Sequence, residues 1–252
     1  MKRPKASGRG GVRRAALARG PAPVEDEIYH LVTEAIIVKQ IRPGGRLKEA
    51  ALASRFGCSR ARVRRVLQRL ADLDVVEFRL NFGAFVSRPS PVEARAVFAT
   101  RRLLEAEAVR LTASRAPSAD FDGLRKCVRR EAQAFERGER GLPALSSRFH
   151  LLLGETCGNP VLAKILNQLV HRCVLIQALY ERQNQHTICL VHEHAGLIDL
   201  MQQGRLDDAV AAMVLHLDHI EASLDYEATA QMDDRLTLSI EHPDPRFERA
   251  ET

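Results

Sequence analysis

Residues 42–70 read RPGGRLKEAALASRFGCSRARVRRVLQRL, and this stretch decides how the first third of the chain folds. A Pro-Gly-Gly break occupies residues 43–45, and residues 47–56 then form a short predicted helix that Gly57 stops. Ser59 can cap a further helix that begins immediately after it. Four aliphatic residues of that helix recur at the helical period and share one face: Val63, Val66, Leu67 and Leu70. The stretch therefore predicts two consecutive helices, the second packed on a core along one face.

The segments on either side of this stretch predict one more helix and a hairpin. From residue 24 onward, apolar residues recur at helical spacing, namely Ile28, Leu31, Val32, Ala35 and Ile36. Downstream, residues 75–78 and 84–86 are short β-prone runs around the turn at residues 81–83. Three helices followed by a hairpin predict a winged helix-turn-helix, which we expect over residues 24–88.

The opposite side of the third helix is strongly basic. Five arginines lie outside its apolar stripe without an acidic residue among them: Arg60, Arg62, Arg64, Arg65 and Arg69. A solvated charged face is the ordinary explanation of such a pattern, but neighbouring like charges repel one another until an anion relieves them. A guanidinium can neutralise phosphate and can form two hydrogen bonds to guanine in the major groove. The helix therefore indicates nucleic-acid binding.

The chain from residue 89 to residue 228 has the pattern of a helical bundle. Ser90, Pro91 and Glu93 make a strong helix start, because serine caps, proline suits the first turn and glutamate can close a capping box. Glycines and prolines separate the predicted helices, which span 91–115, 119–137, 142–157, 160–182, 187–203 and 206–225. Short connections make neighbouring helices antiparallel. The expected fold class is mainly α, with an N-terminal winged helix-turn-helix followed by an all-α antiparallel bundle.

Composition narrows the class of protein. Of the 252 residues, 45% are hydrophobic and 5% aromatic, which suits an aliphatic, helix-rich interior, and the net charge of +6 favours a polyanionic partner. Residues 1–23 are interpreted as a disordered basic arm and residues 229–252 as a polar tail. The five cysteines form no Cys-x-x-Cys pair, and no run of about 18 apolar residues exists. We therefore expect a cytoplasmic protein with neither a disulfide framework nor a membrane span.

One arginine of the first bundle helix projects into an apolar arc. Glu105 follows Arg101 by one turn, and the arc around Arg101 consists of Val97, Leu104, Ala108 and Leu111. An inward arginine needs a partner. Two explanations stay open: a structural pair between Arg101 and Glu105, or a bond from Arg101 to the carboxylate of a ligand.

Three histidines also project inward, from three separate predicted helices. They are His150, His194 and His216, whereas His171 and His192 project outward and His219 is ambiguous. Singly, an inward histidine is usually a hydrogen-bonded core residue. Together, three neutral imidazoles favour a shared divalent metal such as zinc or nickel.

Spaced motifs of the first domain support a family assignment. They are Arg42-Pro43-Gly44-Gly45-Arg46-Leu47, Ala51-Leu52-Ala53, Phe56-Gly57-Cys58-Ser59-Arg60, Val63-Arg64, Leu67 and Gly83. In this order they resemble the GntR family of bacterial regulators, with a departure at Ala61 and Arg62, where the family usually has Thr-Pro.

This resemblance implies which residues read double-stranded operator DNA. Ser59, Arg60, Arg62 and Arg64 would lie at the start of a recognition helix that contacts bases and phosphates. Gly83 would lie in the wing, near the minor groove.

The bundle resembles the FCD effector domain of the FadR-like GntR regulators over roughly residues 92–220. The resemblance rests on Arg101 with Leu104-Glu105, Phe149-His150, Gly158-Asn159-Pro160, Glu193-His194, Ala209, Met213 and His216-Leu217. It implies a homodimer, and an effector site of Arg101, His150, His194 and His216 that takes a small carboxylate. Many members hold a divalent metal with three histidines and an Asp four residues before the first one, and here Ser146 stands at that Asp position.

The sequence thus predicts a ligand-responsive DNA-binding regulator and not an enzyme, and family analogy favours repression over activation. One alternative is a metalloenzyme, because three histidines with an open fourth position also occur at catalytic zinc sites. The chain offers no His-Glu-x-x-His motif and no evident general base beside the three histidines. Another alternative is a helical protein that binds nucleic acid without sequence preference through its basic arm.

Overall fold

A computed structural model describes residues 24–37, 40–115, 120–139, 142–181 and 190–227. The predicted basic arm and the predicted tail lie outside these residues. Within the described residues, no helix is long and apolar enough to cross a membrane.

The first unit is a winged helix-turn-helix, as predicted. Its helices are α1 (Val24–Ile37), α2 (Glu49–Arg55) and α3 (Arg60–Ala71), and its strands are β1 (Arg46–Leu47), β2 (Val76–Arg79) and β3 (Gly83–Val86). The strand order is β1-β3-β2 with antiparallel pairing throughout. β1 was not expected, because two residues carry no periodic signal. Its pairing with β3 ties the chain before α2 to the wing.

Local chemistry sets the ends of these elements. The Ser59 hydroxyl accepts a hydrogen bond from the Arg62 backbone N–H and caps α3. The wing turns through Asn81 and Gly83, whose φ angles of 63° and 90° lie in the left-handed region that asparagine and glycine tolerate. The apolar stripe of α3 is fully buried, so its arginines are left on the outer surface.

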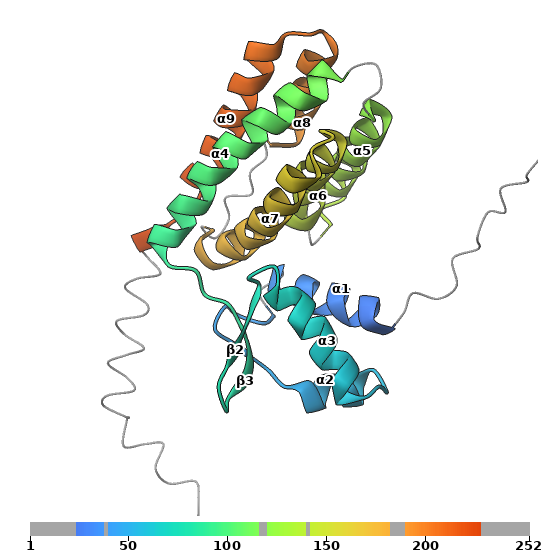
Figure 1. Cartoon of the computed structure of the whole chain (residues 1–252), viewed down its shortest axis with the longest axis vertical. Helices are drawn as coiled ribbons and strands as arrows, with labels where there is room; N and C mark the ends of the chain where they lie inside the picture. Colours follow the sequence, from blue (N-terminus) through green and yellow to red (C-terminus); the bar gives the residue numbers. More distant parts are fainter. Residues whose placement is uncertain (1–23, 38–39, 116–119, 140–141, 182–189, 228–252) are drawn as a thin grey trace, which may run out of the picture.

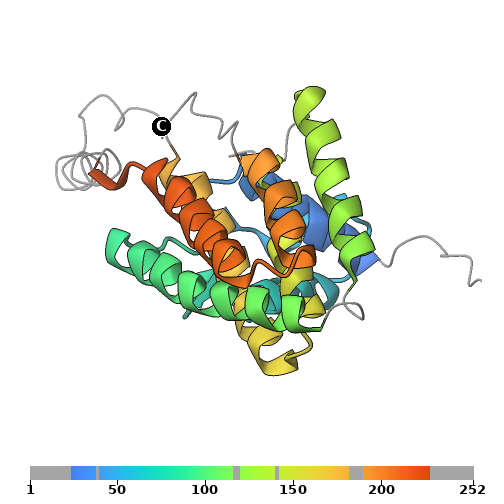
Figure 2. The same cartoon turned by 90° about the horizontal axis from the view of Figure 1, so that it is seen from above.

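The second unit is the predicted antiparallel helical bundle, and the fold class is confirmed. Its helices are α4 (Pro91–Ser114), α5 (Phe121–Glu136), α6 (Leu142–Thr156), α7 (Pro160–Tyr180), α8 (Leu190–Gln202) and α9 (Leu206–Ala222). In Figure 2, α4, α9, α8 and α5 follow one another across the bundle, with α6 and α7 beneath them. Ser90 caps α4, and the carboxylate of Glu93 in its first turn binds Arg172 on α7.

Helix α7 is shared between the two units. The bundle stacks on the winged unit along α1, α6 and α7, as Figure 1 shows. Leu175 and Ala178 of α7 belong to the apolar core of the winged unit, whereas Val170 and Ile176 belong to the core of the bundle. The Gln168 side chain donates a 2.9 Å hydrogen bond to the Asp72 carbonyl at the end of α3. One helix therefore contacts both the core of the bundle and the winged unit.

Candidate functional site

Three histidine side chains meet in the centre of the bundle. His150 comes from α6, His194 from α8 and His216 from α9, and all three are buried. The Nε2 atom of His216 lies 3.0 Å from Nε2 of His194 and 3.2 Å from Nε2 of His150. The helical periodicity predicted that these residues point inward, and the structure brings them to one point.

A carboxylate contacts the Nδ1 atom of each of the three imidazoles, on the side of the ring away from the other two histidines. The Nδ1 atom of His150 lies 2.5 Å from Glu105, that of His194 lies 2.8 Å from Glu131, and that of His216 lies 2.8 Å from Glu193. Because an ionised carboxylate only accepts hydrogen bonds, these contacts favour the tautomer with its proton on Nδ1 and a lone pair on Nε2. The three Nε2 lone pairs therefore face one another. Such carboxylate-held imidazoles are the usual arrangement around a protein-bound metal.

Burial disfavours the protonated form of His150 and His216. Desolvation lowers the pKa of His150 to about 3 and that of His216 to about 4, despite the neighbouring carboxylates. Burial alone would raise the pKa of Glu105, but Arg101 and His150 together lower it to about 2. His150 and His216 are thus neutral, which is the form that ligates a divalent metal, and three imidazoles are a donor set that fits zinc or nickel.

Two buried polar atoms beside the histidines lack a hydrogen-bond partner among the described residues. Arg101 donates from Nε to Glu105 over 2.6 Å, so the expected intrahelical pair is present, but its Nη2 atom is unpaired. Glu131 uses one oxygen for His194 and leaves Oε1 unpaired. The buried guanidinium N–H favours an anionic ligand close by, and the buried carboxylate oxygen favours a cation or a hydrogen-bond donor.

The structure also shows which neighbours the sequence argument missed. Glu131 lies on the buried side of α5 beside Val128, and an acidic residue within an apolar stripe was the signal that could have found it. Glu193 bridges His216 and the half-exposed His219, which lies 2.6 Å from it. Ser146 is half-buried on α6, one turn before His150.

His171 corrects the expectation of a solvated side chain. It is half-buried, and its Nε2 atom lies 3.2 Å from the Tyr29 hydroxyl on α1. The face of α7 that carries His171 points away from the core of the bundle, and α1 of the winged unit covers it.

Acid is expected to destabilise the metal-free protein through these buried imidazoles. The pKa of His150 falls from 6.5 to about 3 on folding, so between these values the unfolded chain binds more protons than the folded one. The contribution of the neutral imidazole to the stability of the folded state is then fully present above pH 6.5 and declines as the pH falls. His150 and His216 should each cost about 2 kcal/mol between pH 6.5 and 5. Thermal melting with a chelator from about pH 7.5 to 4.5 measures this, and an unchanged melting temperature would contradict the burial of neutral imidazoles.

A second candidate surface is the outer face of α3 with the wing. Arg60, Arg62 and Arg64 are exposed and form no ion pair with any described residue. Arg65 pairs with Glu25 at 2.5 Å and Arg69 with Asp26 at 3.2 Å, both on α1. Two of the five arginines thus have acidic partners within the protein, so their repulsion is weaker than the sequence argument assumed. The unpaired positive charge lies at the N-terminal half of α3.

The wing adds residues that the sequence argument did not single out. A Cβ atom on Gly83 would lie 4.0 Å from the guanidinium of Arg46, which places this arginine beside the wing tip. Leu80 and Phe82 are also exposed at the tip. The wing therefore presents a cation and two apolar side chains outward.

Comparisons with known proteins agree with this architecture. Residues 24–86 match the family model described as bacterial regulatory proteins, gntR family, and residues 96–219 match the FCD domain. The HTH-type transcriptional repressor RspR of Escherichia coli K12 is 24% identical over 203 residues, which are 80% of this chain and 89% of that protein. The regulator LutR of Bacillus subtilis is 24% identical over 205 residues, covering 72% and 92%.

Solved structures share the fold. Escherichia coli McbR/YncC superposes with a TM-score of 0.68 at 19% identity, covering 80% of this chain and 97% of that one. A GntR regulator from Rhodococcus sp. RHA1 gives a TM-score of 0.67 at 20% identity, covering 79% and 95%.

Proposed function

The chain belongs to the GntR family of bacterial transcriptional regulators and carries an FCD domain, and from this premise we propose that it is a cytoplasmic repressor released by a small carboxylate effector. The relatives are regulators and not enzymes, so the three histidines serve sensing rather than catalysis. The observation that carries the proposal is the convergence of three Nε2 atoms, each on an imidazole held by a carboxylate.

We propose that His150, His194 and His216 hold a divalent metal. The serine at position 146 removes the anionic ligand that the family resemblance implies, but three carboxylates surround the imidazoles instead. Arg101 neutralises one of them, Glu105, so about two negative charges remain to offset a divalent ion. When bound, such a metal supplies a Lewis-acidic position for an oxygen ligand.

Arg101 is the proposed partner of the effector carboxylate. Its side chain is 2% exposed and its Nη2 atom is unpaired among the described residues, while Nε stays on Glu105. Because Glu105 also contacts His150, the guanidinium and the imidazoles belong to one hydrogen-bonded group. A carboxylate that bonds Arg101 and also completes the metal shell would satisfy both ends of this group.

A thermal-shift screen of small organic acids, with and without zinc or nickel, tests the effector proposal. A ligand of the native state raises the melting temperature. We expect a carboxylate whose stabilising effect requires the metal and is lost in Arg101→Ala. Stabilisation that is equal with and without metal would assign the histidines to direct effector binding instead.

We further propose that Ser59, Arg60, Arg62 and Arg64 contact operator DNA and that Gly83 lets the wing approach the minor groove. This assignment is supported by Arg60, Arg62 and Arg64, which are exposed and have no acidic partner within the part of the chain that the structure describes. A protein that only coats nucleic acid through its basic arm would show no operator selectivity. A gel-shift assay with excess competitor DNA separates the two, because non-specific binding is lost to the competitor.

A homodimer is the proposed assembly, with α4 as its contact. An exposed apolar stripe follows one face of α4 and consists of Val92, Ala96, Ala99 and Leu103. Of these, Val92 is 76% exposed and Leu103 is 74% exposed. Two copies of such a stripe can cover each other across a two-fold axis, which also matches two half-sites of DNA.

Leu103→Glu is expected to dissociate the dimer. It places a charge within the stripe and removes an apolar side chain from the contact, so the dimer dissociation constant should rise at least about tenfold. Sedimentation velocity over a concentration series measures it. The matched control is Val161→Glu, at another exposed apolar residue on α7, which should leave the dimer intact. Equal behaviour of the two variants would contradict the α4 contact.

A further inference from the structure

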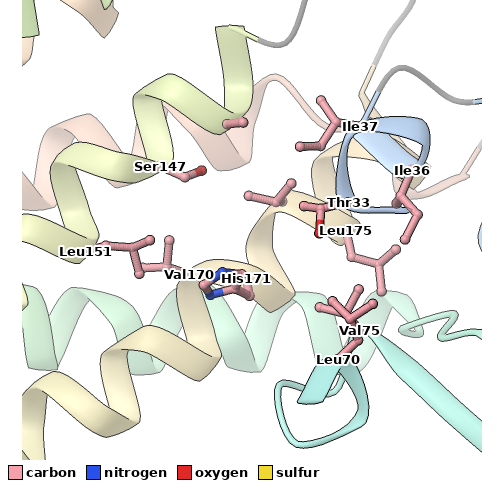
Figure 3. A pocket seen from close by; sticks show the side chains of 12 residues that line it. Thr33, Ile36, Ile37, Leu70, Val75, Ser147, Leu151, Val170, His171 and Leu175 are labelled. Atoms are coloured by element: carbon pink, nitrogen blue, oxygen red, sulfur yellow. The ribbon is translucent and has the colours of Figure 1, made fainter. Parts of the chain in front are cut away.

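A small cavity lies between the winged unit and the bundle, apart from the histidine cluster. Its volume is about 70 Å³, and its walls come from α1 and α3 on one side and from α6 and α7 on the other. Figure 3 shows Ile36 and Thr33 of α1 beside Leu175 of α7, with Leu151 of α6 on the other side of the cavity. Both structural units therefore build one cavity.

The chemistry of these walls suits an apolar occupant. Most of the lining side chains are aliphatic. The Thr33 hydroxyl donates to the Tyr29 carbonyl over 2.8 Å. The two ring nitrogens of His171 are also engaged, with the Asn167 carbonyl at 2.8 Å and the Tyr29 hydroxyl at 3.2 Å. Because these polar groups already have partners, they offer little to a water molecule or to a polar ligand.

The size of the cavity limits the ligand to a few carbon atoms. An engineered apolar cavity of about 150 Å³ stays dry and binds benzene or xenon. The present cavity has about half that volume, so xenon or a short alkyl group fits it, and a larger molecule would need more room. An unfilled cavity also lowers the stability of the folded protein, because its walls lose packing contacts.

We propose that this cavity is a second ligand site, which takes the short alkyl end of an organic molecule. An occupant contacts both units at once, so it stabilises the arrangement in which α1 is docked on α6 and α7. The site is separate from the three-histidine cluster, because its lining residues do not include His150, His194 or His216.

Methyl NMR of the full-length protein under xenon pressure tests this site. The methyl signals of Ile36, Leu151 and Leu175 should shift and saturate, while those of Met213 in the histidine region stay unchanged. Val174→Phe adds a ring to the cavity wall and should abolish these shifts. Ile165→Phe adds the same ring at an exposed position on the same helix and should preserve them.

An enlarged cavity gives a second test that does not depend on the folding of Val174→Phe. Leu151→Ala removes three carbons from the wall, so this variant should gain saturable benzene binding that raises its melting temperature. Benzene should also slow amide exchange in α1 of this variant, since it bridges the two units. Absence of saturable xenon shifts in the wild type together with absence of benzene binding in Leu151→Ala would overturn the proposal. Zinc titration of the same samples reports separately on the histidine cluster.

Discussion

Replacing Arg60 or Arg64 with alanine is expected to weaken specific DNA binding by about 1–3 kcal/mol, or roughly 5- to 150-fold in the dissociation constant. The two residues lie one turn apart on the exposed face of α3, so both can face the same groove. Fluorescence anisotropy measures the effect, with a duplex selected from a random pool by the wild-type protein. The competitor is a scrambled duplex of equal length.

Arg65→Ala and Arg69→Ala are matched controls on the same helix. Their guanidinium groups pair with Glu25 and Asp26 of α1, so we expect little change in affinity for the selected duplex. A loss in these two variants, with Arg60→Ala and Arg64→Ala binding normally, would mean that another face of α3 contacts the DNA.

Removing one imidazole, in His194→Ala, should lower zinc affinity by about 100-fold or more, since a lost ligand costs at least as much as a lost outer-shell partner. Glu131→Gln keeps the shape of the side chain but removes its charge behind His194, and the expected loss is about 10- to 100-fold. Ser146→Asp restores an anion one turn before His150 and should tighten binding. Competition with a chromophoric chelator measures all three affinities.

His219→Ala is the control for the zinc measurements, because His219 is half-exposed and its contact with the cluster runs through Glu193. We expect its zinc affinity to stay within a few-fold of the wild type. If wild-type protein purified without chelator holds no metal and Ser146→Asp gains none, the metal proposal fails. The histidines would then bind the effector directly.

Local patterns in the sequence predicted most of the fold. The apolar period and the glycine and proline breaks placed α4 to α9 within a few residues of their observed ends, because helix formation depends on neighbouring residues. β1 was missed, since its two residues are defined only by pairing with β3, about forty residues along the chain.

The sequence predicted that the three histidines point inward, but it did not predict which residues they contact. Helical periodicity shows that His194 points inward, yet its contact with Glu131 joins residues 63 positions apart. A single helix cannot reveal such a pair. The expectation for His171 was wrong for a related reason, because its partner Tyr29 belongs to the other unit. Contacts between units follow from packing, which no helical pattern contains.

X-ray absorption at the zinc edge of the zinc-loaded protein tests the central claim most directly. The account predicts one zinc per chain with three imidazole nitrogens at about 2.0–2.1 Å and an oxygen-type ligand at the remaining position. Its three imidazoles would be those of His150, His194 and His216, so the histidine signal should drop in His194→Ala. A shell with no imidazole signal, or with the same signal in His194→Ala as in the wild type, would contradict a metal at this cluster.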